Sequence, residues 1–299
     1  MSKPWLLIDT NYMARRAMHS TGHLQFGDVK TGLVYGVLQS VRDIGEKFGT
    51  SKFIWCFDYG KNKRLEVLPT YKSSRKKKRE LNRKERRAEA SYQEQLRQLH
   101  KKYLSKIGFK NIFAEDGYEA DDMIAVLLKT VLKKEEAVII SSDHDLYQLV
   151  TKRHVQYNPN SGEVMHRKLF KKRYSLKPSQ WARVKALAGC SSDDVPGVKG
   201  VGENTAISYI NGTLPEHYKV YQRLENEGVD VELENMGLVS LPFGELRGRK
   251  AADFVLQEDD LTWKRWSKFC KKYGMASILD HPPIPLERKQ NRGRKRQSV

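Results

Sequence analysis

Short apolar segments alternate with amphipathic segments along the first half of the chain. The continuous apolar runs have the length of buried strands, and they occupy residues 5–8, 53–57, 112–114 and 138–140. Between the first two runs, residues 32–48 carry apolar side chains at the spacing of one helix face. Strands that alternate with helices predict an α/β fold with a mostly parallel central sheet flanked by helices.

Acidic residues follow three of these four predicted strands. Asp9 and Asp58 come directly after the first two runs, and Asp143 and Asp145 follow the fourth in the sequence Ser-Ser-Asp-His-Asp. Because the carboxyl ends of parallel strands meet at one edge of a sheet, we expect these acids to lie together.

A second acidic group opens a predicted helix. Glu119, Asp121 and Asp122 belong to the sequence Gly-Tyr-Glu-Ala-Asp-Asp and precede an apolar stretch of helical spacing. Beside the strand-end acids they would complete an oxygen-rich cluster, and such clusters suit hard ions such as Mg²⁺ or Mn²⁺. The alternative is that each acid only caps a helix or turn. The repetition of acids at strand ends favours a metal site.

The chain is strongly basic, with 55 Lys and Arg against 36 Asp and Glu and a net charge of +19. Residues 61–110 hold eighteen basic and five acidic side chains, so a polyanion is the expected partner. A solvated helix face or a disordered tail is the alternative for such a segment. Its position between two predicted strands favours a segment over the crevice, where its cations would meet phosphates and Tyr71 would stack on a base.

The sequence also indicates the cellular compartment in which the protein acts. No apolar run approaches the length of a membrane span, and residues 1–9 lead into a strand rather than resembling a signal peptide. The three cysteines, Cys56, Cys190 and Cys270, are widely spaced and lack the spacing of a zinc site. We expect a reducing compartment, the cytoplasm of a bacterial or phage-infected cell, and no membrane contact.

A glycine-rich segment separates two predicted helices at residues 189–206, with the sequence Gly-Cys-Ser-Ser-Asp-Asp-Val-Pro-Gly-Val-Lys-Gly-Val-Gly-Glu-Asn-Thr-Ala. Its glycines let the backbone approach a ligand, and a helix that begins near Glu203 would direct N–H groups toward a phosphate. The alternative is a connector between two packed helices. From Pro215 onward we expect short helices and a helix near 261–273 whose aromatic residues pack, followed by a basic, disordered tail at 285–299.

Together these motifs resemble the 5′-nuclease superfamily of flap endonucleases, the 5′-exonuclease domain of bacterial DNA polymerase I and small bacteriophage 5′-3′ exonucleases. The resemblance runs from about Trp5 to Leu241 and rests on the strand ending at Asp9, on Phe57-Asp58, on Arg64 with Tyr71-Lys72 and Arg75, and on residues 118–122, 142–145 and 189–206. It implies a PIN-like core at 1–174 with a helical arch at about 72–107, a helix-three-turn-helix region with C-terminal helices at 175–284, and the tail at 285–299.

The resemblance also implies a set of site residues. Two divalent ions, Mg²⁺ or Mn²⁺, would support phosphodiester hydrolysis, and K⁺ would bind at the helix-three-turn-helix. The implied ligands of the first ion are Asp9, Asp58, Glu119 and Asp121, and those serving the second are Asp122, Asp143, Asp145 and Asp193. Lys72 and Arg75 are the implied catalytic cations. The expected nucleic-acid contacts are Arg64, Tyr71, Lys72, Arg75, Lys76, Lys77, Lys78, Arg79, Gly197, Lys199, Gly200, Gly202 and Thr205.

Three positions depart from the family pattern. Cys190 stands where the motif Gly-Asp-x-x-Asp has its first Asp, and a thiol is a poor partner for Mg²⁺, so weaker binding of the second ion is expected. Asp194 occupies a usual Asn position and offers partial compensation. Asn204 stands where the family commonly has a phosphate-binding Lys, which leaves Lys199 as the nearby cation.

The expected function is a metal-dependent 5′-3′ exonuclease and flap endonuclease that acts during replication. Its substrates would be DNA with 5′ flaps or free 5′ ends and RNA primers in RNA–DNA hybrids. We expect a monomer that couples to a polymerase or a single-strand-binding protein through contact between chains. Two alternatives stay open, a DNA-binding accessory protein weakened in catalysis by Cys190 and an RNA-cleaving nuclease on a related sheet.

Overall fold

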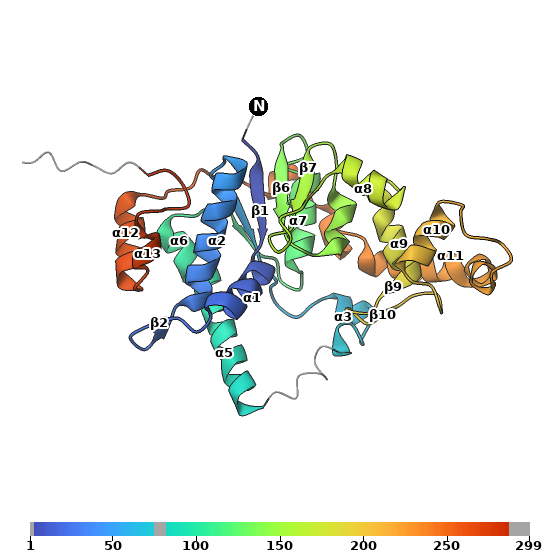
Figure 1. Ribbon diagram of the computed structural model, residues 1–299, viewed down its shortest axis with the longest axis horizontal. Helices are drawn as coiled ribbons and strands as arrows, with labels where there is room; N and C mark the ends of the chain where they lie inside the picture. Colours follow the sequence, from blue (N-terminus) through green and yellow to red (C-terminus); the bar gives the residue numbers. More distant parts are fainter. Residues whose placement is uncertain (1–2, 75–81, 287–299) are drawn as a thin grey trace, which may run out of the picture.

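A six-stranded sheet with the order β5-β4-β1-β6-β7-β8 forms the centre of the molecule (Figure 1). The computed structural model describes residues 3–74 and 82–286. The strands are β1 (Trp5–Asp9), β4 (Lys52–Cys56), β5 (Ile112–Phe113), β6 (Ala137–Ile140), β7 (His154–Tyr157) and β8 (Val164–Met165). Every pair is parallel except β7 with β8. The mostly parallel sheet predicted from the sequence is therefore confirmed.

Helices cover both faces of this sheet. Leu6 and Ile8 of β1 pack against α1 (Thr10–Thr21) and α2 (Gly32–Phe48) on one face. Leu7, which points the other way because side chains alternate along a strand, packs with α7 (Ala120–Lys129). The fold is thus a three-layer α/β arrangement, and the carboxyl ends of β1, β4 and β6 share one edge.

The basic segment forms helices that begin beside the sheet edge. Its described elements are α3 (Arg64–Val67), α5 (Arg83–Gln98), the π-helical turn η1 (Leu99–Tyr103) and α6 (Leu104–Ile107). In Figure 1, α5 projects away from the body of the molecule. Its C-terminal end is anchored, since Leu96 in its last turn and Leu99 in the following η1 are buried in the core that contains α1 and α2.

A separate helical core lies beside the sheet, around Trp181 and Leu224. Its helices are α8 (Arg167–Tyr174), η3 (Pro178–Gln180), α9 (Trp181–Ala188), α10 (Glu203–Ile210) and α11 (Lys219–Val239). The expectation of only short helices beyond Pro215 is wrong, because α11 has 21 residues. It buries only four residues, among them a glycine and an asparagine. Its sequence therefore lacks the regular spacing of apolar residues that would predict a long helix.

The last helices, α12 (Trp263–Lys272) and α13 (Ala276–Leu279), return to the first core and lie beside α6 (Figure 1). The rings of Tyr103 and Phe269 are 5.4 Å apart there. Residues 175–284, which were expected to form one region, therefore contribute to three cores, because Leu241 and Phe243 also pack in the core that contains α7.

The remaining short elements connect these layers. They are β2 (Gln25–Phe26), β3 (Val29–Lys30), η2 (His144–Leu149), β9 (Gly189–Cys190), β10 (Val195–Pro196), η4 (Gly244–Gly248) and η5 (Ala251–Asp253). Among the helices of residues 3–74 and 82–286, none combines the length and the apolar character needed to cross a bilayer.

Candidate active site

The strand-end acids line one cavity at the carboxyl edge of the sheet. Asp9 is the last residue of β1, and Asp58 and Asp143 follow β4 and β6. All three line a cavity of about 480 Å³ together with Glu119 and Asp121 from the start of α7. The predicted convergence of these acids at one edge is therefore confirmed, although they come from four separate parts of the chain.

A second, narrower cavity adjoins the first. It shares Glu119, Asp121 and Asp143 with the larger cavity and adds Asp145, Cys190 and Asp193. One potential ligand atom from each of the last three residues lies within 4.8 Å of the others. We call the seven carboxylates of the two cavities the acidic cluster; its members are Asp9, Asp58, Glu119, Asp121, Asp143, Asp145 and Asp193.

Local hydrogen bonds fix the first acids in place. Asp9 caps α1 and accepts a hydrogen bond of 3.0 Å from the Tyr12 N–H and one of 2.8 Å from Ser141 Oγ. Asp58 Oδ1 accepts the N–H of Ala120 at 2.8 Å, which ties the end of β4 to the start of α7. These contacts leave the carboxylates crowded together, and no Lys or Arg of the described residues 3–74 and 82–286 forms an ion pair with Asp9.

This crowding raises the pKa of several carboxyl groups. Burial and the neighbouring Asp58 raise the pKa of Asp9 to about 7. Partial desolvation and Glu119 raise the pKa of Asp58 to about 6. Desolvation and Asp143 raise the pKa of Asp121 well above its usual value. Like charges this close tolerate full ionisation only when cations lie between them, so the cluster has the electrostatics of a divalent-ion site.

Glu119 has both a lysine and a tyrosine hydroxyl as partners. Lys72 Nζ forms an ion pair with Glu119 Oε1, and Tyr71 Oη donates a hydrogen bond of 3.0 Å to Glu119 Oε2. Tyr71 Oη also lies 3.2 Å from Asp193 Oδ2. Consistent with these charges, Lys72 and Arg64 lower the pKa of Glu119 against the effect of its burial.

Asp122 lines neither cavity and forms a buried ion pair. Its two oxygens accept hydrogen bonds of 2.7 and 2.8 Å from the Arg64 guanidinium, and Oδ1 also accepts the Phe243 N–H at 2.8 Å. Asp122 is 0% exposed and Arg64 is 2% exposed. The oxygens of Asp122 are thus committed to Arg64 and to backbone N–H groups, and the buried Arg64 also lies 3.3 Å from Glu119 Oε2. We therefore correct the expectations that Asp122 is a metal ligand and that Arg64 contacts a nucleic acid, and we assign the pair a structural role.

The expectation that Tyr71 stacks on a base is corrected for the same reason. The Tyr71 side chain is 5% exposed and its hydroxyl is committed to Glu119 and Asp193. Tyr71 therefore positions carboxylates rather than offering an open aromatic surface. The five expected contacts Arg75, Lys76, Lys77, Lys78 and Arg79 lie outside the described residues.

Lys72 lies between the two cavities and lines both. Its backbone adopts φ +54°, which non-glycine residues seldom do, and its N–H donates to the Asp193 carbonyl at 2.9 Å. Ser74 N–H donates to Asp194 Oδ2 at 2.8 Å. The segment that carries Lys72 is thus bound to residues 193–194, and Asp194, offered as a compensating ligand, is engaged in this contact.

Lys185 is a residue of the site that the sequence did not reveal. Its Nζ lies 2.9 Å from Asp145 Oδ1 and 2.7 Å from Glu203 Oε1, and these two carboxylates raise the pKa of Lys185. The thiol of Cys190 lies 3.9 Å from Asp145 Oδ2. The sequence signal was weak, because Lys185 is one of two basic residues in a mostly apolar helix just before the Gly-Cys motif.

Helix α5 forms a wall of the larger cavity through Tyr92 and Gln93. Arg15 of α1 holds this wall, since its guanidinium contacts Glu89 at 2.7 and 2.8 Å and lies 3.5 Å from the centre of the Tyr92 ring. Neither Arg15 nor Tyr92 belongs to a motif, so periodicity alone gave no reason to select them.

The expected nucleic-acid contacts of the glycine-rich segment divide into two groups. Gly197 packs against the backbone of Gly189, where a Cβ would lie 2.4 Å from the Gly189 nitrogen, so Gly197 serves the turn rather than a ligand. Lys199, Gly200 and Gly202 are exposed, and Gly202 caps the start of α10 with Thr205 in its first turn. These four residues stay available as predicted phosphate contacts.

Comparisons with known proteins agree with this geometry. The family model of the 5′-3′ exonuclease N-terminal resolvase-like domain matches residues 4–175. A 5′-3′ exonuclease of Bacillus subtilis is 31% identical over 253 residues, which cover 80% of this chain and 75% of that protein. A thermostable DNA polymerase I of Thermus thermophilus is 39% identical over 134 residues, and this match covers 44% of the chain but only 16% of the polymerase.

Two solved structures share the fold. The T5 5′-exonuclease with bound divalent zinc ions gives a TM-score of 0.68 at 24% identity and covers 80% of this chain and 90% of its own. The catalytic core of Rad2 in complex with a DNA substrate gives a TM-score of 0.55 at 17% identity and covers 96% of this chain and 93% of its own. The structural likeness establishes the fold, and the family model with the Bacillus subtilis relative establishes the family. The chain belongs to the 5′-3′ exonuclease family.

Proposed function

We propose that this chain is a divalent-metal-dependent 5′-nuclease that hydrolyses phosphodiesters of DNA bearing 5′ flaps or free 5′ ends. The observation that carries the proposal is the acidic cluster, in which carboxylates from β1, β4, α7, β6 and the 190–193 turn line two adjoining cavities. Family relatives are named 5′-3′ exonucleases, and the related T5 enzyme was crystallised with divalent ions.

The donor set fits one hard ion better than two. The larger cavity offers only carboxylate oxygens as anionic donors, which suits Mg²⁺ or Mn²⁺. The smaller cavity mixes the carboxylates of Asp145 and Asp193 with the Cys190 thiol, and a softer ion suits that mixture. When bound, divalent ions supply Lewis acidity to the phosphodiester and lower the pKa of attacking water.

The chain's own cations would orient the substrate. Lys72 is close enough to Glu119 and Asp193 to sit beside any ion held there, with a side chain that is 25% exposed. A scissile phosphate that enters the larger cavity would meet this ammonium group, which would offset charge that develops on the phosphate oxygens. We propose Arg75 as its partner from the family pattern.

The finer features follow from the same proposal. Exposed Lys199, Gly200 and Gly202 and half-buried Thr205, in the turn before α10 and in its first turn, would hold duplex phosphates, and we propose K⁺ at that helix-three-turn-helix. The proposal also includes RNA primers in RNA–DNA hybrids as substrates and a role in replication in the cytoplasm. We further propose that the protein is a monomer that contacts a polymerase or a single-strand-binding protein. The accessory-protein alternative is not favoured, because a protein that only binds DNA has no need of seven crowded carboxylates.

A time course on a labelled 5′-flap duplex tests the proposed function. We expect cleavage near the flap base with Mg²⁺ or Mn²⁺ and none in EDTA, because the uncompensated cluster repels phosphate. A duplex with a 3′ flap of equal length and chemically blocked 5′ ends is the matched control and should stay intact. Tight flap binding without cleavage at any divalent-ion concentration would instead support the accessory-protein alternative.

The Cys190→Asp variant tests the composition of the smaller cavity. Replacing the thiol with a carboxylate should lower the Mg²⁺ concentration for half-maximal cleavage roughly tenfold, because Mg²⁺ prefers oxygen ligands. Cys190→Ser is the control, since it removes the sulfur without adding a charge, and should not lower that concentration.

Spectroscopy gives a readout of the thiol that does not depend on cleavage. In the parent protein, Cd²⁺ should produce an ultraviolet thiolate-to-metal charge-transfer band and release a proton, because a coordinating thiol is deprotonated. Cys190→Ser should lack the band. An unchanged Mg²⁺ titration in Cys190→Asp, or a band that survives in Cys190→Ser, contradicts the assignment of Cys190 to the metal site.

A further inference from the structure

A second concave surface lies at the opposite end of the sheet from the acidic cluster. It surrounds the start of β7 and the end of α7, whereas the acidic cluster lies at the start of α7 and beyond the end of β6. The ten residues of α7 separate the two regions by about 15 Å. The cavity has a volume of about 660 Å³.

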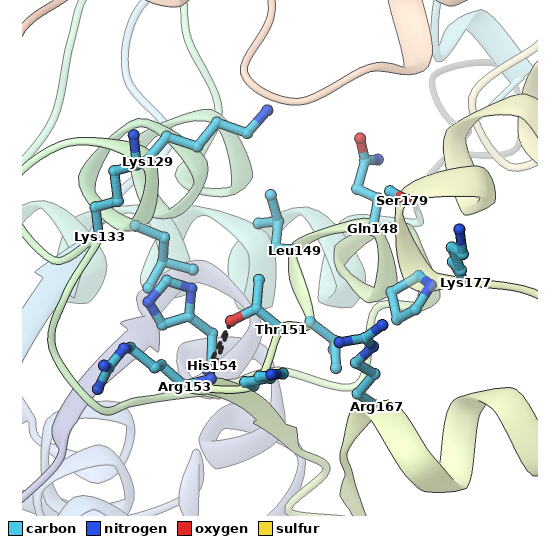
Figure 2. Close-up of a pocket in the computed structure, with 14 residues that line it drawn as sticks. Lys129, Lys133, Gln148, Leu149, Thr151, Arg153, His154, Arg167, Lys177 and Ser179 are labelled. Carbon is cyan, nitrogen blue, oxygen red and sulfur yellow. Dashed lines mark hydrogen bonds between the residues drawn. The ribbon is translucent and has the colours of Figure 1, made fainter.

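Cations dominate the rim of this cavity. Six basic side chains line it and no Asp or Glu does; the six are Lys129, Lys133, Lys152, Arg153, Arg167 and Lys177. In Figure 2, five of them surround Leu149 and Thr151, with Lys129 and Lys133 on one side and Arg167 and Lys177 on the other. We call this cavity the basic pocket.

Most of this charge is not neutralised by the chain itself. Arg153 lies 3.4 Å from Glu136 in an exposed pair, and Lys129 Nζ donates to the Leu241 carbonyl. Within residues 3–74 and 82–286, no carboxylate lies within 4.0 Å of the charged groups of the other four. His154 adds no charge at neutral pH, because burial lowers its pKa.

The floor of the basic pocket is apolar. Leu128, Leu149, Val150 and Pro178 line it, and all four side chains are buried. A volume of this size accommodates several side chains, and pockets with an apolar floor and a few charged groups bind ligands of matching character. An occupant must therefore combine negative charge with an apolar group.

We propose that the basic pocket binds an acidic peptide segment of a partner protein, one that carries an apolar side chain next to its carboxylates. The carboxylates would pair with the rim cations, and the apolar side chain would cover the leucine, valine and proline floor. A DNA duplex fits less well, because its phosphates lie on the outside of a rod and leave an apolar floor uncovered. Binding at the basic pocket would then bring the nuclease to its partner and leave the acidic cluster of the nuclease open.

Fluorescence anisotropy with a labelled peptide of several aspartates and one phenylalanine tests the proposal on the full-length chain. We expect binding that weakens as salt is added, and at least a tenfold loss of affinity in the double variant Lys152→Glu with Arg167→Glu. Charge reversal at two sites replaces attraction with repulsion at each of them. The matched control is Lys171→Glu with Lys172→Glu on the exposed side of α8, which has the same change in net charge and should retain affinity.

Each other outcome overturns the proposal. Equal losses in both double variants would indicate unspecific attraction to a basic protein. Unchanged affinity for a peptide in which serine replaces the phenylalanine would show that the apolar floor does not contribute to binding. Loss of blunt-duplex binding in the pocket variant, with no peptide binding by the parent, would assign the pocket to DNA. Thermal unfolding and flap cleavage of both double variants should match the parent, which shows that each has folded.

Discussion

Replacing Asp122 with Ala is expected to lower the free energy of unfolding by about 3–5 kcal/mol. The Arg64 guanidinium would be left buried without its bidentate partner, and the Phe243 N–H would lose its acceptor. The pair also joins three distant segments, because Arg64 follows β4, Asp122 opens α7 and Phe243 follows α11. For a chain of this size the midpoint of thermal unfolding should fall by roughly 6–20 °C.

The adjacent acid provides the matched control. Asp121 lines both cavities, and its pKa is raised by desolvation and by Asp143, so its charge destabilises the metal-free protein. Asp121→Asn should therefore unfold in EDTA at or above the temperature of the parent, while Asp122→Ala unfolds well below it. Equal midpoints of thermal unfolding for the two variants would contradict the assignment of Asp122 to stability and of Asp121 to the metal site.

A double variant separates the lost pair from a general packing defect. Arg64→Met combined with Asp122→Leu removes both charges and should recover part of the stability lost by Asp122→Ala, because no buried charge is left without a partner. A double variant as unstable as Asp122→Ala would show that the loss comes from packing.

Local pattern was sufficient to predict much of the sheet and its acids. The helix at 32–48 and the strand at 5–9 have the predicted bounds, since each is a continuous run with one period and clear ends. Asp9, Asp58 and Asp143 converge because strand direction alone determines where strand ends lie. These predictions depend only on patterns among residues that are close together in the sequence.

The division between Asp121 and Asp122 could not be predicted in the same way. Both are acids in the first turn of one helix, and which of them faces the cavity depends on the phase of that helix against the sheet. The partner of Asp122 is 58 positions away, at Arg64, and a basic residue inside a basic segment carries no sign that it is buried. The same holds for Lys185, whose two carboxylate partners come from η2 and α10.

Asp9→Asn is expected to reduce flap cleavage by about a thousandfold, because metal-ion catalysis contributes several kcal/mol to such reactions and each 1.4 kcal/mol is tenfold. Flap binding should persist, since Asp9 is 7% exposed and repels phosphate rather than attracting it. Asn keeps the cap of α1, because its side-chain oxygen can still accept the Tyr12 N–H. Single-turnover cleavage and flap affinity measure the two effects separately.

The same variant should be more stable than the parent in EDTA, and the gain should depend on pH. Burial and Asp58 raise the pKa of Asp9 from 3.8 to about 7, so the folded state binds more protons than the unfolded state between these values. The stability contributed by this group therefore falls as pH rises from about 4 to about 7, by on the order of 2–4 kcal/mol. Asp9→Asn removes that loss.

The advantage of Asp9→Asn in unfolding experiments should be small at pH 4 and fully developed above pH 7. Inactivity combined with higher metal-free stability cannot arise from misfolding, because a misfolded variant would lose both. An inactive variant that is no more stable than the parent at pH 8 in EDTA would mean that Asp9 is not held among like charges. A variant that cleaves at the parental rate would exclude Asp9 from the ligands, since a neutral amide cannot replace an anionic oxygen on a divalent cation without cost.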